Sequence, residues 1–292
     1  WIMKELLILS GKGGTGKTTI ASAFIRLSEA KAYGDCDVDA PNLHLITGQR
    51  YDPLVTDYYG LPKAEFDQDL CIECDRCRQN CRFDAIYVED GYHVDAFACE
   101  GCSVCEMVCP AAAITMKPAV AGALMLYTQD ASVFSTAQLK MGSGTSGMLV
   151  TKVKKQMKSI DVDTDLAIID GSPGIGCPVI ASLSGVDMVL IVTEPSISGI
   201  SDMERIIKTV GKFGIKTAVC INKYNTNLEN TEKIQDFCKK KGLSFIGNIP
   251  YDSEAVKAIN MGQTIVDVEC DSGRAVRVIY QKTRALLFES ER

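Results

Sequence analysis

The chain has 292 residues, of which 46 % are hydrophobic and 23 % charged, and its formal net charge is −6. This composition is ordinary for a globular protein, and the acidic balance argues against a nucleic-acid-binding protein, which needs a basic face. No run approaches the ~18 consecutive apolar residues of a membrane span, and the first residues lack a signal-peptide pattern, so we expect a cytoplasmic protein. The 13 cysteines are the unusual feature. An odd number without a secretory signal indicates metal ligation rather than disulfides.

Apolar runs of strand length alternate with helical patterns along most of the chain. Such alternation predicts an α/β fold with a mostly parallel sheet and helices on both faces. A final apolar pattern at helical spacing, over residues 276–287, is expected to pack on the sheet rather than to bind a membrane. The expected strands cover residues 4–9, 32–35, 123–128, 166–170, 188–193, 216–222 and 243–249, and the expected helices cover residues 17–30, 148–159, 200–213 and 228–241.

Cysteine density divides the chain, because eight of the 13 cysteines lie between Cys71 and Cys109. This density predicts a small α+β domain at residues 64–117, inserted into an α/β domain formed by residues 1–63 and 118–292. Within the insertion, residues 86–94 are expected to form a hairpin with an Asp-Gly turn. The insertion holds 11 Asp and Glu against 4 Lys and Arg, so the acidity of the chain is concentrated there.

The first expected strand leads into Ser10-Gly11-Lys12-Gly13-Gly14-Thr15-Gly16-Lys17-Thr18-Thr19, and a helical pattern follows. This segment matches the phosphate loop G-x-x-x-x-G-K-[ST], in which glycines let backbone N–H groups face the phosphates. Lys17 is expected to reach the β- and γ-phosphate oxygens, and Thr18 is expected to ligate Mg²⁺. The nucleotide-binding residues expected here are Gly13, Gly14, Thr15, Gly16, Lys17, Thr18 and Thr19.

Lys12 adds a second cation to this loop. With this additional lysine, the sequence resembles the MinD and nitrogenase iron protein group of P-loop ATPases, whose deviant Walker A loop carries a signature lysine. The resemblance implies ATP and Mg²⁺ as cofactors and a homodimer that forms on ATP binding. It also implies that Lys12 crosses the dimer interface to the partner's nucleotide, so that Lys12 and Lys17 are both catalytic. The alternative for Lys12 is a solvated lysine on a loop.

Two acidic stretches support the resemblance. Residues 35–43 look like the family's first switch, which implies that Asp37 contacts Mg²⁺ through water and that Asp39 is catalytic and orients the attacking water. Asp170 ends an expected strand and, with Gly174, looks like the Walker B aspartate and second switch. An aspartate at a strand end can instead cap a helix. By the same resemblance, two later strand ends imply adenine contacts by Asn222, Lys223, Pro250 and Tyr251.

Two cysteine runs share one spacing, with two, two and three residues between successive cysteines. This duplicated spacing is typical of ferredoxins with two [4Fe–4S] clusters, in which the fourth cysteine of each run ligates the other cluster. Zinc is the alternative, because C-x-x-C pairs also build zinc sites. Arg82 stands where a proline usually follows the fourth cysteine, which removes no ligand. The expected ligands are Cys71, Cys74, Cys77 and Cys109 for cluster one, and Cys99, Cys102, Cys105 and Cys81 for cluster two.

The chain as a whole resembles MinD-superfamily ATPases that contain an inserted ferredoxin domain. The resemblance implies ATP-gated electron transfer from two clusters to a protein partner, and the acidic insertion predicts a basic patch on that partner. One alternative is an ATPase that assembles or carries iron–sulfur or metal cofactors, but the CPxC pair of known carriers is incomplete here, because Val179 and Ile180 follow Cys177-Pro178. The other is a MinD-like spatial-positioning ATPase. Cys177 itself is either a packed thiol or a ligand to a metal shared across a dimer axis.

Overall fold

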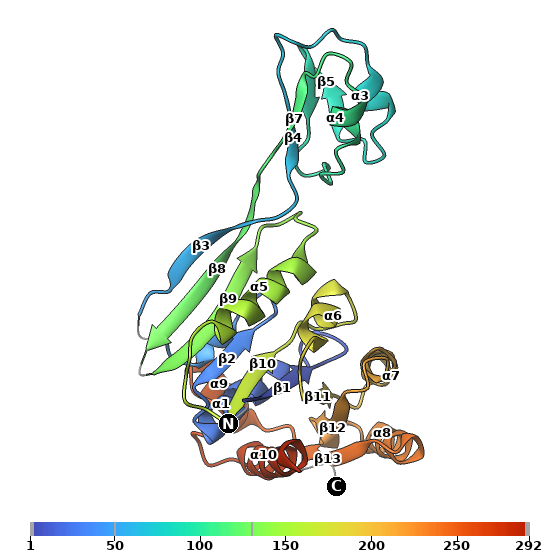
Figure 1. The fold of residues 1–292 in the computed structure, drawn as a ribbon. Helices are drawn as coiled ribbons and strands as arrows, with labels where there is room; N and C mark the ends of the chain where they lie inside the picture. The colour runs from blue at the N-terminus through green and yellow to red at the C-terminus, as the bar shows by residue number, and fades with distance from the viewer. Residues whose placement is uncertain (1–2, 50, 130, 290–292) are drawn as a thin grey trace.

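The computed structural model describes residues 3–49, 51–129 and 131–289. Its main sheet is built from β1 (Lys4–Leu9), β2 (Ala32–Asp35), β3 (Leu54–Tyr59), β8 (Val120–Gln129), β9 (Ser132–Leu139), β10 (Leu166–Asp170), β11 (Met188–Thr193), β12 (Lys216–Asn222) and β13 (Ser244–Ile249). The nine strands lie in the order β13-β12-β11-β1-β10-β2-β9-β8-β3 (Figure 1). Neighbours from β13 to β9 are parallel, whereas β8 and β3 extend the sheet in antiparallel fashion.

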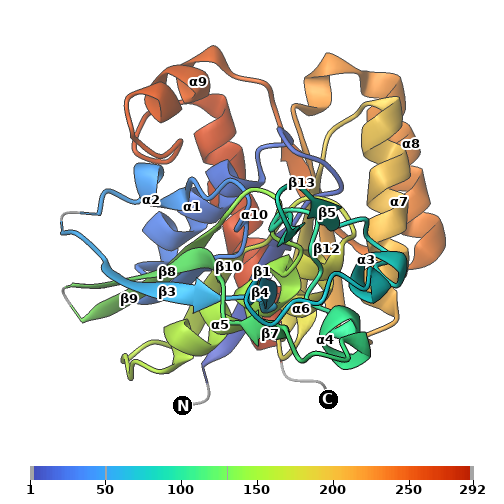
Figure 2. The ribbon, with the colours of Figure 1, turned by 90° about the horizontal axis from the view of Figure 1, so that it is seen from above.

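Helices cover both faces of this sheet. They are α1 (Lys17–Ser28), α2 (Leu43–Ile46), α5 (Ser146–Lys158), α6 (Cys177–Leu183), α7 (Ile197–Gly211), α8 (Leu228–Lys241), α9 (Ser253–Asn260) and α10 (Asp271–Phe288), with a 3-10 turn at Tyr224–Thr226. One apolar core lies under α5, α6, α7 and α8, and a second lies under α1, α9 and α10. Figure 2 shows α1 and α10 on one side of the sheet and α5 and α6 on the other. In the described part of the chain, none of the helices combines the length and the apolar character that crossing a bilayer requires.

The predicted α/β architecture is confirmed. The expected strands at 4–9, 32–35, 166–170, 188–193 and 216–222 coincide with β1, β2, β10, β11 and β12, because strands buried on both faces read as continuous apolar runs. The expected helices fall on α1, α5, α7 and α8 within a few residues, and the last helical pattern is α10. The sequence did not predict β3 or β9. β3 is largely exposed, and β9 carries the buried polar residues Ser135 and Thr136, one on each face, so neither strand reads as an apolar run.

The inserted segment has small sheets and a core of its own. β4 (Lys63–Phe66) pairs with β7 (Ile114–Lys117), and β5 (Ile86–Val88) pairs with β6 (Tyr92–Val94). Two short helices, α3 (Arg76–Gln79) and α4 (Val104–Val108), accompany them. A separate apolar cluster includes Ala64, Ile86 and Ile114. The β5–β6 hairpin turns at Asp90 and Gly91, which both have positive φ (48° and 115°), as expected for an Asp-Gly turn.

Two adjacent strands connect this segment to the main sheet. β3 and β8 stay paired as far as Tyr59 and Val120, and the pairing resumes with Lys63 opposite Lys117. Between these pairs, the Gly60 N–H donates to the Ala119 carbonyl over 3.3 Å. Figure 1 shows the segment standing away from the main sheet at the end of this two-stranded stalk. The chain therefore enters and leaves the segment at neighbouring positions.

This connection generates a test of the domain boundaries predicted at residues 64 and 117. If residues 64–117 are replaced by an Asn-Gly turn, the neighbouring ends of the stalk can be joined without strain. The shortened chain is expected to unfold cooperatively and to keep the α/β circular dichroism spectrum. Loss of the cooperative transition would show that the segment is part of the same folding unit.

Candidate functional site

The loop between β1 and α1 is held in place from across the sheet. The Asn222 side-chain amide donates to the Thr15 carbonyl over 2.8 Å, and the Lys223 ammonium donates to the Gly14 carbonyl over 3.2 Å. Gly16, just before α1, has a φ of 91°, and a side chain there would collide with Asn222. Only glycine combines this conformation with such a close approach. Asn222 and Lys223, predicted to read adenine, therefore contact the phosphate loop itself.

A buried ion pair lies beneath the loop. Lys17 Nζ lies 2.5 Å from Asp170 Oδ1, and the two side chains are 6 % and 0 % exposed. The Thr18 hydroxyl donates to the other Asp170 oxygen over 2.6 Å. Burial alone would lower the pKa of Lys17, but the charges of Asp170 above all, and then of Asp35 and Asp37, raise it. Lys17 is therefore a fixed cation at the carboxyl ends of the central strands, where a P-loop protein binds phosphate.

Asp35 is the residue that the sequence analysis missed. It ends β2 directly opposite Asp170 in the strand register, and both side chains are fully buried. Burial, and then the charge of Asp170, raise the pKa of Asp35 to about 7. Its carboxylate accepts the N–H groups of Asp37, Asn42 and Leu43 over 3.0–3.1 Å and so shapes the proposed first switch. The feature that could have identified Asp35 is its position as the last residue of β2, which lies beside the strand that ends in the Walker B aspartate.

The segment after Asp170 contacts both other parts of the site. The Gly174 N–H donates to the Ser10 carbonyl of the phosphate loop over 3.0 Å. The Ser172 hydroxyl donates to the Cys36 carbonyl, next to Asp35, over 2.6 Å. The phosphate loop is thus in direct contact with residues 170–176, and this segment leads directly into α6.

A cavity of about 670 Å³ opens above the loop. Its lining includes apolar residues of β13 and α9, among them Ile249, Ala255 and Ile259, and such a surface suits the flat ring of a nucleobase. The predicted residues Asp170 and Gly174 lie outside the cavity lining, Asp170 because it is buried beneath Lys17 and Thr18. The predicted residues that line the cavity are Gly13, Gly14, Thr15, Gly16, Lys17, Thr18, Thr19, Asp37, Asp39, Asn222, Lys223, Pro250 and Tyr251.

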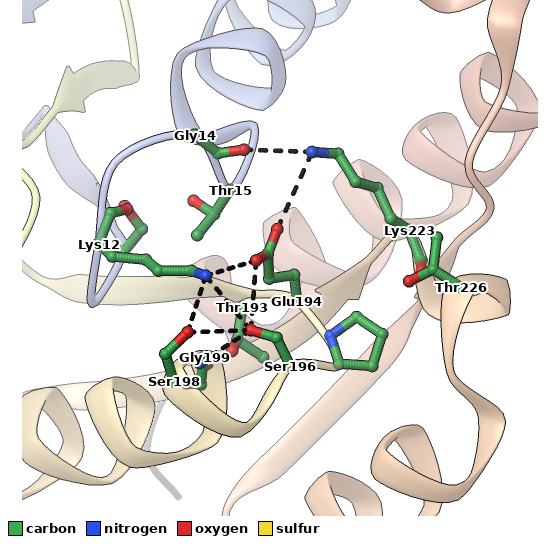
Figure 3. Close-up of polar contacts among 12 residues, drawn as sticks. Lys12, Gly14, Thr15, Thr193, Glu194, Ser196, Ser198, Gly199, Lys223 and Thr226 are labelled. Carbon is green, nitrogen blue, oxygen red and sulfur yellow. Dashed lines mark hydrogen bonds and ion pairs between the residues drawn. The ribbon is translucent and has the colours of Figure 1, made fainter.

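Lys12 lies outside the cavity lining as well. Figure 3 shows its side chain directed toward the end of β11, where its Nζ lies 2.6 Å from Glu194 Oε1. Lys223 lies on the other side of the same carboxylate, with 3.9 Å between its Nζ and Glu194 Oε2. Lys12 is therefore not a phosphate ligand within its own cavity.

The eight clustered cysteines surround two separate cavities in the inserted segment. One is lined by Cys71, Cys74, Cys77 and Cys109, and the other by Cys81, Cys99, Cys102 and Cys105. Each set takes three cysteines from one run and the fourth from the other run, which is the crossed arrangement that the spacing predicts. The Ala113 N–H donates to the Cys109 sulfur over 3.3 Å, as backbone amides do to cluster thiolates.

In the described residues, no three His, Cys, Asp or Glu side chains converge closely enough to hold a single metal ion. A [4Fe–4S] cubane needs a wider spacing, because each of its four irons takes its own thiolate. Of the other cysteines, Cys36, Cys220 and Cys238 are buried, and burial raises the pKa of each thiol, to about 12 for Cys220 and about 11 for Cys238. Such thiols are inert, whereas Cys177 is exposed at the start of α6.

Residues 6–265 match the family model of the CobQ/CobB/MinD/ParA nucleotide binding domain. The chain belongs to this family. The uncharacterized protein MJ0578 of Methanocaldococcus jannaschii is 29 % identical over 293 residues, covering 98 % of each chain, and the septum site-determining protein MinD of Escherichia coli is 22 % identical over 287 residues, covering 92 % of this chain and 87 % of MinD. The solved structure of MinD with Mg-ADP from Pyrococcus horikoshii aligns with a TM-score of 0.59 at 17 % identity, covering 98 % of both chains, and shows the same fold. The protein is a MinD/ParA-family ATPase that binds and hydrolyses ATP.

Asp35 and Asp39, two acidic residues of the first switch, are expected to differ in their effect on ATP hydrolysis, because Asp35 is buried and Asp39 is exposed. Asp35→Asn removes a buried charge beside Asp170 and weakens three backbone hydrogen bonds, so ATP hydrolysis should fall about 10- to 100-fold, the scale of lost hydrogen bonds to a charged group. Asp39→Asn changes an exposed side chain at the cavity rim and should alter the rate less than about threefold. Steady-state phosphate release measures both. A larger loss in Asp39→Asn would support the catalytic role that the sequence resemblance implies for Asp39, which stays a prediction.

Proposed function

We propose that the protein is an ATP-hydrolysing iron–sulfur protein, in which the nucleotide state gates electron transfer from two [4Fe–4S] clusters to a protein partner. The observation that carries the proposal is the pair of cavities in residues 64–117, each lined by four cysteines in crossed order. Four thiols per cavity match the ligand requirement of a cubane, and one apolar cluster includes or contacts six of the eight cysteines. When bound, such clusters would supply one-electron transfer.

The nucleotide site would use Mg²⁺ held at the carboxyl ends of β2 and β10. Thr18 and Asp170 already lie in contact, and Asp37 lines the cavity beside them. Hard oxygen ligands of this kind suit Mg²⁺ bound together with phosphate oxygens. ATP would also bring two subunits together, with Lys12 of each reaching across the interface.

A continuous set of contacts supports coupling between the two sites. The second switch ends at Cys177, and Gly147 packs so closely that a side chain there would come within 3.2 Å of Cys177 Cβ. Thr145, just before α5, accepts a hydrogen bond from the buried Tyr58 hydroxyl of β3 over 3.4 Å. β3 continues into the stalk, where the Lys63 ammonium donates to the carbonyl of Cys99. A shift at the second switch can thus reach the cavity proposed for cluster two through packed neighbours.

The partner would carry a basic patch. The insertion has an excess of seven acidic residues, and four thiolates outweigh the charge of a [4Fe–4S]²⁺ core, so bound clusters make the segment more negative. Association would then be steered electrostatically and weaken with salt.

The MinD-like spatial-positioning ATPase is the second candidate, because the relatives include the septum site-determining protein MinD of E. coli. In MinD-like function the clusters would be incidental and ATP-dependent binding to lipid vesicles would be the activity. In this chain the apolar residues of α10, including Val276, Ile279 and Leu287, are buried against the second core. The carrier alternative is less favoured, because Ile180 stands where the CPxC pair of known carriers has its second cysteine.

Iron analysis tests the proposal directly. Protein purified without oxygen should contain roughly eight irons and eight sulfides per chain, as two cubanes require. Cys74→Ser and Cys102→Ser, one in each cavity, should each lose about four irons, while Cys220→Ser, buried in β12, should lose none. Zinc in place of iron, or iron content indifferent to both cluster substitutions, would contradict the proposal.

Gating is tested at the contact between Gly147 and Cys177. Gly147→Val adds a side chain that must displace the start of α6, whereas Gly211→Val, at the end of α7, meets open space and is the matched control. In the control, ATP should change the rate at which the reduced protein reduces cytochrome c, a basic one-electron acceptor. In Gly147→Val this nucleotide effect should shrink to less than about twofold while iron content stays the same. An undiminished ATP effect in Gly147→Val would exclude coupling through the contact between Gly147 and Cys177. In a separate assay, transfer of intact clusters to an apo-protein would favour the carrier alternative.

A further inference from the structure

The ammonium group of Lys12 is fully satisfied inside its own subunit. Besides the ion pair with Glu194, its Nζ donates to the Ser196 hydroxyl over 3.2 Å and to the Ser198 hydroxyl over 3.0 Å (Figure 3). An ammonium has three N–H donors, and these three acceptors match them in number. Glu194 and Ser196 belong to the segment that joins β11 to α7, and Ser198 lies in the first turn of α7.

Glu194 is the centre of this arrangement. It accepts the Ser196 hydroxyl over 3.2 Å and lies between the ammonium groups of Lys12 and Lys223. Burial would raise the pKa of Glu194, but hydrogen bonding and charge from Lys12, and then the charge of Lys223, lower it on balance. Both cations belong to the border of the phosphate loop, since Lys12 is part of the loop and Lys223 donates to the Gly14 carbonyl.

We infer that Glu194 is a positioning residue for ATP-driven dimerisation, because it holds Lys12 in its own subunit until the nucleotide of a second subunit competes for the ammonium. This inference rests on the ATP-dependent dimer of the proposed function. A lysine that lies outside its own cavity cannot stabilise its own polyphosphate, so Lys12 must leave Glu194 before it acts on phosphate. Ser196 and Ser198 release it together with Glu194, since their hydroxyls belong to the same contact.

The contact has the strength that a reversible switch needs. The Lys12 and Glu194 side chains are 32 % and 20 % exposed, so solvent screens their attraction. Removing such a partly exposed ion pair should shift the equilibrium between bound and released Lys12 by about fivefold. A twofold-symmetric dimer breaks two copies of the contact, so the effects multiply to about 25-fold in the dimer dissociation constant.

The experiment measures dimerisation by analytical ultracentrifugation with the non-hydrolysable analogue AMPPNP and Mg²⁺. Glu194→Gln keeps the shape of the side chain and removes its charge, and it should tighten the dimer about 25-fold. Ser198→Ala removes one acceptor and should shift the dimer in the same direction by less. Glu232→Gln, which removes the same charge from an exposed position on α8, should change it by less than about twofold.

A double-mutant cycle separates this role from a structural one. Glu194 could instead shape the phosphate loop through Lys223, and that effect would persist without Lys12. In a Lys12→Ala background, Glu194→Gln should therefore leave AMPPNP affinity, measured by calorimetry, unchanged. An equal or weaker dimer in both Glu194→Gln and Ser198→Ala, or a change in AMPPNP affinity that survives in Lys12→Ala, would overturn the inference. Absence of any dimer in the unaltered protein would overturn both the inference and the proposed dimer, whereas iron content tests the cluster proposal independently.

Discussion

The ion pair between Lys17 and Asp170 is the interaction on which the nucleotide site depends. Both charges lie almost completely out of water, and breaking such a pair by removing one partner costs about 3–5 kcal/mol. The pair forms only because β1 and β10 are parallel neighbours, so that the phosphate loop and Asp170 emerge at the same edge. Asp35 adds a second carboxylate from the next strand, and Lys17 partly neutralises both. A polyphosphate would compete with these carboxylates for the same cation, so nucleotide binding must rearrange the residues that Asp35 and Asp170 hold.

In the proposed coupling, those residues would connect the nucleotide cavity with the inserted segment. Asp35 fixes the first switch through backbone N–H groups, and the segment after Asp170 is tied to both Ser10 and Cys36. The second switch leads directly into α6, which packs against the start of α5 at Gly147. The stalk strands β3 and β8 are part of the same continuous sheet. Because packed elements move as units rather than deform, the proposed coupling would displace the inserted segment as a rigid unit.

Most of the fold followed from local signals, and the parts that did not follow depend on tertiary partners. β11 and the centre of β12 are apolar and buried, and both strands were predicted with the bounds that the structure shows, because burial on both faces leaves no alternation to interpret. β9 carries Ser135, which is buried but bonded to Gln156 on α5, and no local pattern indicates that pairing. Likewise, three aspartates follow one another at alternate positions from Asp35 to Asp39. Only the strand register, which places the first of them opposite Asp170, shows that Asp35 is the buried one.

The cysteines and Lys12 show what sequence patterns can and cannot predict about a site. The cysteine runs encode their geometry in short spacings, and the structure brings Cys109 to the first run and Cys81 to the second as the spacing requires. Lys12 was recognised as an extra cation, but its partner Glu194 is distant in sequence and carries no motif. The contact exists because β1 and β11 are adjacent parallel strands, so that the residues following each strand meet at one edge. A carboxylate at the end of β11 therefore reaches the loop after β1. The pairing of β1 with β10 builds the phosphate site, and the pairing of β1 with β11 provides the acceptor that holds the second lysine outside the cavity lining.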